Sequence, residues 1–286
     1  MAPAATIRPM SAPLITLLTD FGLRDPSAAI CAGVILGIAP DARILDISHE
    51  VRKYAVRDGA LLLWCALPYL PVGIHVAVVD PGVGTARRPV AIRVGRGDVL
   101  IGPDNGLLLP VTDRLGGVVE ARELTEAAYR LPVVSTSFHG RDIFAPAAAH
   151  LATGVPFDRI GPTIDPGDLV RLRWPEPEIG DGALRTSVIY RDTFGNVKLA
   201  ALADDLTAAL GGLEPGDRLT LAFAASGEAP ARSETMTWQR TFGSVASGTP
   251  LVYEDSYGRL CVAVNQGDAV TRFGIVDDQR VSIRRA

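Results

Sequence analysis

The sequence predicts an α/β N-terminal domain with a largely parallel sheet, followed by a smaller all-β C-terminal domain. Two observations support this fold class. Strand-like and helix-like segments alternate up to about residue 173, which is typical of parallel strands joined by helical crossovers. Beyond that point short strand-like segments follow one another with few helical patterns, as in antiparallel sheets and barrels.

Changes in composition give the expected boundaries. Residues 1–13 lack the apolar core of a signal peptide and are expected to form a flexible tail. The N-terminal domain is expected over residues 14–173 and the C-terminal domain over residues 184–286. Between them, residues 174–183 are rich in proline, glycine and charge, which favours a linker.

In the first domain, apolar runs bounded by glycine and proline predict strands and helices in alternation. Strands are expected within residues 14–22, 42–48, 74–80, 89–95 and 98–106. Helices are expected within residues 24–40, 56–67 and 147–154. The uncharged run over residues 59–79 is long enough to span a bilayer. Because Pro68, Pro71 and Gly73 divide it, a helix and then a buried strand are expected there instead.

The second domain shows mostly alternating patterns of period two. Strands are expected within residues 184–192, 196–200, 218–224, 249–255, 259–267 and 279–285. A single brief helical pattern covers residues 204–212. A small antiparallel sheet or barrel is therefore expected.

Composition excludes several classes of protein. The net charge is −4 and no basic tract occurs, so nucleic acid is not expected as a partner. The three cysteines, Cys31, Cys65 and Cys261, are widely spaced. They favour neither a disulfide framework nor a zinc knuckle, and they suggest a cytoplasmic location. No membrane partner is expected.

Three polar clusters adjoin predicted elements of the first domain: TDFGLRD, DPGVGTARR and TSFHGRD. In α/β sheets ligands bind beyond the carboxyl ends of the strands, so these clusters are candidates for one crevice. Each also has a structural interpretation. Asp25 is placed to cap a helix, Gly82 and Gly84 to serve a turn, and His139 to be a core histidine.

Several common cofactor-binding and catalytic motifs are absent from the sequence. The string GVGTAR lacks the third glycine of a dinucleotide fingerprint, and neither a P-loop nor a GxSxG elbow occurs. With only four histidines and no histidine–carboxylate spacing, a metal site is not expected.

Five motifs occur in a fixed order: TDFG..D, VVDPGVGT.R, SFHGRD, D.FGN and DS.G.L..AVNQG.A. Together they resemble the S-adenosylmethionine hydroxide adenosyltransferases, relatives of the enzymes that make 5′-fluoro- and 5′-chloro-deoxyadenosine. The resemblance runs from about Leu14 to the C-terminus. It implies a homotrimer whose substrate site lies between the N-terminal domain of one subunit and the C-terminal domain of its neighbour.

The implied reaction is hydrolysis of S-adenosyl-L-methionine, in which water or hydroxide attacks ribose C5′ and releases methionine and adenosine. The family's catalytic Asp–Arg–His set falls on Asp80, Arg87 and His139, whereas Arg88 lies outside the pattern and is expected to be a surface charge. No cofactor is expected, because a sulfonium is already a good leaving group. Which of Asp80 and His139 acts as the base stays open.

The resemblance also implies a substrate-binding set. Asp20 would bind the ribose hydroxyls, because one carboxylate accepts two hydrogen bonds. The methionine ammonium and its surroundings would meet Asp25, Ser27 and Asp192, and the methionine carboxylate would meet Ser256 and the backbone of Tyr257. The adenine pocket would be formed by the residues Phe194, Asn196, Phe242 and Gln266.

Two alternative functions stay open. One is a 5′-halogenase, although the halide-using relatives carry tyrosine at the positions of Asp80 and His139, and a carboxylate would repel a halide ion. The other is a non-catalytic S-adenosylmethionine or adenosine sensor, which would need the binding motifs but not the Asp80–Arg87–His139 set. A dinucleotide-dependent oxidoreductase is disfavoured by the missing glycine fingerprint.

Overall fold

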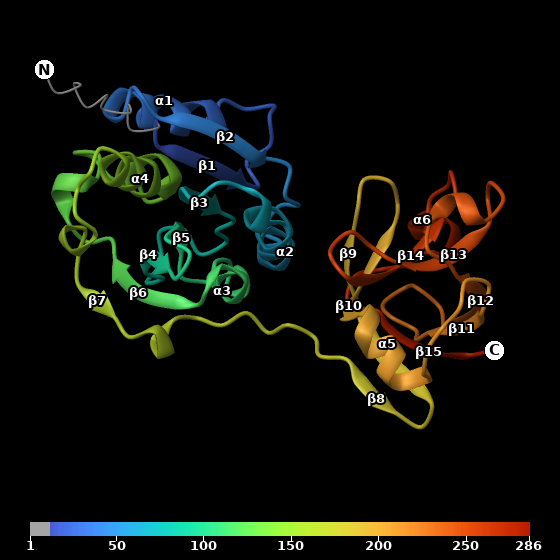
Figure 1. Ribbon diagram of the computed structural model, residues 1–286. Helices are drawn as coiled ribbons and strands as arrows, with labels where there is room; N and C mark the ends of the chain where they lie inside the picture. Colours follow the sequence, from blue (N-terminus) through green and yellow to red (C-terminus); the bar gives the residue numbers. More distant parts are fainter. Residues whose placement is uncertain (1–11) are drawn as a thin grey trace, which may run out of the picture. The chain divides into compact units, whose positions relative to one another are not determined.

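The computed structural model describes residues 12–286. The chain forms two compact units (Figure 1), the first ending at Leu172 and the second beginning at Arg173. Each unit has its own hydrophobic core. Most of the expected N-terminal tail, residues 1–11, lies outside the described residues.

The first unit is built on a seven-stranded sheet with the order β2-β1-β3-β5-β4-β6-β7. Its strands are β1 (Leu14–Thr19), β2 (Arg43–Ser48), β3 (Ile74–Val78), β4 (Pro89–Val94), β5 (Val99–Pro103), β6 (Val118–Glu123) and β7 (Thr163–Ile164).

The sheet is mixed, so the expectation of a largely parallel sheet is wrong. Strand β1 pairs in parallel with β2 and β3, and β3 pairs in parallel with β5. In contrast, β4 is antiparallel to β5 and β6, and β6 is antiparallel to β7. The reason is the connection between β4 and β5. Residues 95–98 form a tight turn, which is far too short for the crossover that a parallel pair requires.

Helices cover both faces of this sheet. On one face, α1 (Ser27–Ile38) packs against α4 (Ala145–Ala152) and against Ile15, Leu17 and Val76 of the sheet. On the other face lies α2 (Val56–Ala66), where a Cβ at Gly59 would meet Leu18 and Val79. Neighbouring residues such as Leu17 and Leu18 point to opposite faces, as expected of a strand.

Short segments complete the first unit. They are α3 (Leu109–Thr112), a π-helical turn η4 (Gly140–Phe144) and the 3₁₀ turns η1 (Leu67–Tyr69), η2 (Asp113–Leu115), η3 (Ala127–Tyr129), η5 (Phe157–Arg159) and η6 (Pro166–Asp168). Among the helices of residues 12–286, none combines the length and the apolarity needed to cross a membrane.

The second unit is a closed β-barrel. Its sheet has the order β10-β14-β13-β12-β11-β15-β9-β8, and an additional β9–β10 pairing closes it. The strands are β8 (Glu178–Gly180), β9 (Ala183–Arg191), β10 (Val197–Leu202), β11 (Arg218–Phe223), β12 (Arg232–Trp238), β13 (Pro250–Glu254), β14 (Arg259–Val264) and β15 (Arg280–Arg285). Strand β8 lies within the segment expected to be a linker and pairs with β9.

The barrel is filled by apolar side chains that alternate along its strands, such as Leu219, Leu221 and Phe223 of β11. The barrel unit also contains the helices α5 (Ala203–Leu210) and α6 (Ala269–Phe273) and the 3₁₀ turn η7 (Phe242–Ser244). Helix α5 matches the single helical pattern expected there.

Candidate functional site

The carboxyl ends of three parallel strands meet at one edge of the first sheet. Strand β1 lies between β2 and β3. Asp20 follows β1 and Asp80 follows β3 closely along the chain, and Lys53 and Tyr54 lie in the segment after β2. This is where ligands bind in parallel α/β sheets.

A cleft of about 260 Å³ opens at this edge. Four residues of the expected site line it: Asp20, Ser27, Asp80 and His139. Its walls also include Phe21 and Phe138, which belong to the clusters TDFGLRD and TSFHGRD, and Lys53 and Tyr54, which the sequence did not indicate. Lys53 and Tyr54 could have been found from the rule that ligands meet all neighbouring parallel strands at their carboxyl ends.

Arg87 joins the two other members of the expected catalytic set. Its Nε donates to both carboxylate oxygens of Asp80 at 3.0 Å, and its Nη2 also contacts Oδ2. The same Nη2 lies 2.9 Å from Nδ1 of His139. The Arg87 and Asp80 side chains are only 8% and 5% exposed, so this ion pair is held largely out of water.

The contact with Arg87 fixes the proton arrangement of His139. A guanidinium can only donate, so Nδ1 of His139 accepts and the proton of the neutral imidazole lies on Nε2. Burial, reinforced by the positive charge of Arg87, holds the pKa of His139 below its usual value. The imidazole is therefore neutral over a wider range of pH than an exposed histidine.

A glycine turn carries Asp80 and Arg87 into this arrangement. The Val83 N–H donates to the Asp80 carbonyl at 3.2 Å, and the Thr85 N–H donates to the Gly82 carbonyl at 3.2 Å. Gly84 has φ +77°, and a Cβ there would lie 2.2 Å from the carbonyl oxygen of Thr136. Only glycine fits both the backbone conformation and this approach.

The remaining candidates of the first unit are placed differently from one another. Asp20 accepts the Tyr54 N–H at 2.8 Å through Oδ2 and lines the cleft. Asp25 is exposed, does not line the cleft and makes no side-chain cap to α1, which begins after Pro26. Arg88 is not a simple surface charge, because its Nε donates to Asp104 at 2.9 Å.

In the second unit, the turn between β9 and β10 is organised by Asp192. Its Oδ1 accepts the N–H groups of Phe194 and Asn196, both at 2.9 Å, and its Oδ2 accepts from Asn196 Nδ2 at 2.9 Å. Phe194 is 78% exposed, whereas Asn196 is buried. The turn thus presents an aromatic ring to the surroundings.

The other candidates of the second unit lie on neighbouring turns. Phe242 packs against Tyr253 with ring centroids 4.7 Å apart. Ser256 is exposed, and the Tyr257 N–H, expected to bind a carboxylate of the substrate, donates to Asp255 at 2.8 Å. Gln266 is exposed and has φ +54°.

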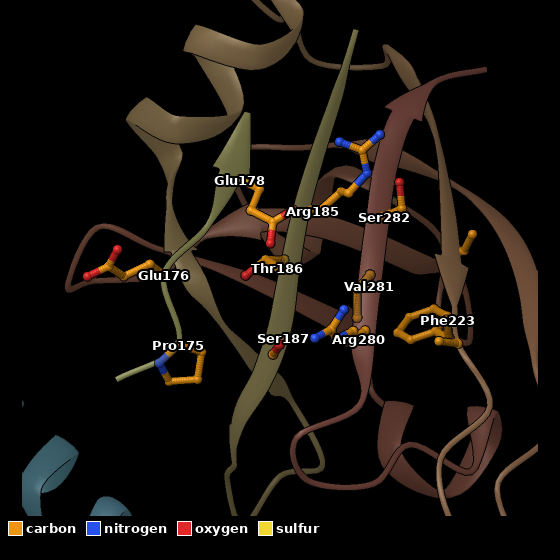
Figure 2. A pocket seen from close by; sticks show the side chains of 12 residues that line it. Pro175, Glu176, Glu178, Arg185, Thr186, Ser187, Phe223, Arg280, Val281 and Ser282 are labelled. Atoms are coloured by element: carbon orange, nitrogen blue, oxygen red, sulfur yellow. The ribbon is translucent and has the colours of Figure 1, made fainter. Parts of the chain in front are cut away.

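A larger groove, of about 500 Å³, lies elsewhere in the second unit. Figure 2 shows it between the segment that holds Pro175, Glu176 and Glu178 and the strands that carry Arg185 and Arg280. None of the seven candidates of this unit lines it. Size alone therefore does not identify the site, and the smaller cleft of the first unit holds the clustered polar groups.

Within residues 12–286, no group of three or more histidine, cysteine, aspartate or glutamate side chains is arranged to hold a metal ion.

Comparison with protein families gives a match for each unit. Residues 15–161 match the SAM hydroxide adenosyltransferase N-terminal domain, and residues 186–282 match the C-terminal domain of the same family. Together the two matches cover both the cleft of the first unit and the turns of the barrel.

Individual relatives agree with these matches. The chain is 45% identical to the (R)-S-adenosyl-L-methionine hydrolase of Salinispora tropica over 273 residues, which are 95% of this chain and 97% of that protein. A fluorinase of an Actinoplanes species is 27% identical over 300 residues, covering 96% of this chain and 98% of that protein. The crystal structure of a conserved protein from Thermotoga maritima superimposes with a TM-score of 0.85 at 33% identity, covering 95% of this chain and all of that one.

Proposed function

Because this chain belongs to the SAM hydroxide adenosyltransferase family, we propose that it hydrolyses S-adenosyl-L-methionine to adenosine and L-methionine. The observation that carries the proposal is the Asp80–Arg87–His139 network at the cleft beyond β1 and β3. A binding protein needs no such network, whereas a hydrolase must orient and deprotonate water.

In the proposed reaction, a water oxygen forms a bond to ribose C5′ while the bond from C5′ to the sulfonium sulfur breaks. The electron pair of that bond goes to sulfur, which leaves as the neutral thioether of methionine. The water proton passes to a protein group. No metal or cofactor is required, because the positive charge on sulfur disappears as the bond breaks and the main task is positioning.

The hydrogen bonds support one distribution of roles within the network. His139 Nδ1 accepts from Arg87, so its Nε2 carries the proton and acts as a donor to the attacking water. Asp80 is the remaining acceptor, and we assign it as the base. Arg87 holds the carboxylate and the imidazole in a fixed relative position and favours the developing hydroxide.

The binding residues are proposed as follows. Asp20 Oδ1, left over after Oδ2 accepts the Tyr54 N–H, would bind the ribose hydroxyls, and Ser27 and Asp25 would meet the methionine end. The barrel would supply Asp192, Ser256 and the backbone of Tyr257 to the methionine end, and Phe194, Asn196, Phe242 and Gln266 to the adenine. Asp192 Oδ2 accepts one hydrogen bond within the turn and can accept a further one.

We also propose that the protein is a homotrimer in which the barrel of one subunit completes the cleft of its neighbour. The strongly exposed Phe194 ring and the exposed Tyr54 beside the cleft support this assembly. A fully active monomer in light scattering would contradict the trimer.

A cytoplasmic location is proposed as well, because all three cysteines are free thiols.

The decisive experiment is incubation of the purified protein with S-adenosyl-L-methionine in ¹⁸O-water, with and without chloride. The expected products are ¹⁸O-labelled adenosine and methionine, unaffected by chloride. A 5′-halogenated nucleoside would indicate a halogenase. Binding of the substrate without turnover would indicate a sensor.

A further inference from the structure

A fully buried carboxylate, Asp142, lies within the SFHGRD segment but outside the cleft. It belongs to the π-helical turn Gly140–Phe144 that directly follows His139, and its side chain is 0% exposed. π-Helical turns within helices often occur at functional sites. A buried charge is costly unless it is paired and hydrogen-bonded, so its partners indicate its purpose.

The partners of Asp142 all belong to one segment, residues 131–141. Its Oδ2 accepts the Ser135 N–H at 2.8 Å, and its carbonyl accepts the Leu131 N–H at 2.9 Å. Its own N–H donates to the Phe138 carbonyl at 3.1 Å. The loop that leads to His139 is thus held at three points, one through the Asp142 carboxylate and two through the Asp142 backbone.

The ion pair between Asp142 and Arg141 also connects Asp142 to the aromatic wall of the cleft. Arg141 Nε donates to Asp142 Oδ1 at 2.6 Å, and its guanidinium lies 5.1 Å from the centroid of the Phe138 ring. Phe138 in turn meets Phe21 edge to face, with centroids 5.7 Å apart. Both aromatic rings line the cleft beside Asp20.

The same loop also supports the opposite side of the network. The Thr136 carbonyl is the atom that approaches Gly84 so closely that no Cβ would fit. Gly84 belongs to the turn that carries Asp80 and Arg87. The position of the loop therefore sets the spacing between His139 on one side and Arg87 on the other.

We propose that Asp142 is the positioning residue that sets this spacing, holding His139 against Arg87 without touching the substrate. The inference rests on the proposed hydrolysis for its kinetic consequence, but its effect on His139 exists without any substrate. A displacement of about 1 Å in such a network can reduce a rate by ~10²-fold.

The test is Asp142→Asn, which keeps the shape and an acceptor for the Ser135 N–H but removes the charge. The matched control is Asp98→Asn, since Asp98 is also 0% exposed and pairs with an arginine. For Asp142→Asn we expect kcat for S-adenosyl-L-methionine to fall ~10- to 100-fold, with KM within ~3-fold of wild type. For Asp98→Asn we expect a lower Tm and an unchanged kcat.

A second readout follows the imidazole of His139 by NMR during a pH titration. The charged groups that act on it are Arg87, Asp80, Asp142 and Arg130, and Asp20 and Lys53 line the same cleft. Loss of the Asp142 charge by itself lowers the pKa of His139, so the signal that reports position is the tautomer. The ring ¹⁵N shifts should show Nε2 protonation in wild type and in Asp98→Asn, and a mixture of tautomers in Asp142→Asn, where the contact with Arg87 is loosened. This readout still decides the inference if wild-type protein does not hydrolyse S-adenosyl-L-methionine, a result that would overturn only the proposed function.

Wild-type kcat together with a wild-type His139 tautomer in Asp142→Asn would overturn the inference. So would an equal loss of kcat, per folded molecule, in both variants. If Asp142→Asn does not fold, Arg141→Gln replaces it, because that side chain is 37% exposed and folding should tolerate the change. A several-fold loss of kcat is then expected, and a wild-type rate with a wild-type His139 tautomer would count against the proposal.

Discussion

Two networks of aspartate, arginine and histidine occur in the first unit, and they differ in which group stands in the middle. In one, Asp98 lies between His75, whose Nε2 is 2.9 Å away, and Arg96, whose Nε is 2.7 Å away. In the other, Arg87 lies between Asp80 and His139.

The central group determines what each network can do. Asp98 accepts from both neighbours, and Thr16 completes the hydrogen bonding of His75 through Nδ1 at 2.9 Å. Both ring nitrogens of His75 are therefore bonded within a core where the histidine is 1% exposed. When arginine is central, the carboxylate and the imidazole stand at the outside and face a cleft. The same three residue types thus form a buried structural network around Asp98 and a candidate reaction centre around Arg87.

The largest effect is expected from Asp80→Ala. Removal of the proposed base should reduce adenosine formation by ~10²–10⁴-fold, while binding of S-adenosyl-L-methionine stays measurable by calorimetry. Quantification of adenosine by chromatography gives the rate. Turnover at the wild-type level would show that the cleft network is no more catalytic than the one around Asp98.

Asp98→Asn should have the largest effect on stability. Burial alone would raise the pKa of Asp98, but the hydrogen bonds from His75 and Arg96 hold it well below its usual range. The carboxylate therefore stabilises the fold above its unfolded pKa of about 3.9, and this contribution is lost as the pH falls through the folded pKa. At neutral pH we expect a loss of roughly 3 kcal/mol in the free energy of unfolding.

Urea denaturation measures this loss, with kcat as the control. The difference between wild type and Asp98→Asn should shrink in strong acid, where the wild-type carboxylate is also protonated. A constant difference at all pH values would contradict the ionic origin of the effect.

His139→Gln should reduce kcat by roughly 10- to 100-fold, because the donor that orients the water is displaced. The folded pKa of His139 lies below the unfolded value of about 6.5. As the pH falls below that value, the unfolded chain takes up a proton before the folded protein does. The stability that the neutral imidazole contributes is therefore complete above about pH 6.5 and declines below it. Because the imidazole of the folded protein stays neutral below about pH 6.5, wild-type activity should persist there. A kcat–pH profile of both proteins checks this, and an identical acid limb in the variant would exclude His139 as its source.

The smallest effect is expected from Thr16→Val. The substitution keeps the shape of the side chain but leaves Nδ1 of buried His75 without its partner, which costs about 1–3 kcal/mol. Thermal denaturation should show a lower Tm, and kcat should not change. A change in kcat would mean that the two networks communicate through β1 and β3.

The sequence allowed much of the fold to be predicted, because strands such as β1, β3 and β14 are apolar runs with clear ends. It did not indicate β6, where Glu120, Arg122 and Glu123 interrupt the apolar pattern, or β12 with its polar sequence RSETMTW. The antiparallel pairing of β4 and β5 could have been inferred from the short connection between them, because a parallel pair needs a long crossover. The pairings of β6 and β7 could not be inferred, because neither strand was expected.

For the candidate site, the five motifs led to Asp80, Arg87 and His139, which the structure brings together. Lys53 and Tyr54 have no motif of their own, and only the adjacency of β2 to β1 places them at the cleft. The hydrogen bonds of Asp142 depend on a π-helical turn, which has no recognisable pattern in sequence.

The contact between Gly84 and the Thr136 carbonyl has a consequence for protein engineering. Because no side chain fits between them, the turn with Asp80 and Arg87 and the loop that leads to His139 form one interlocking piece. A designer who wished to transplant this constellation onto another parallel sheet would have to move both segments together, with the glycine retained. Grafting three side chains alone would not reproduce their spacing.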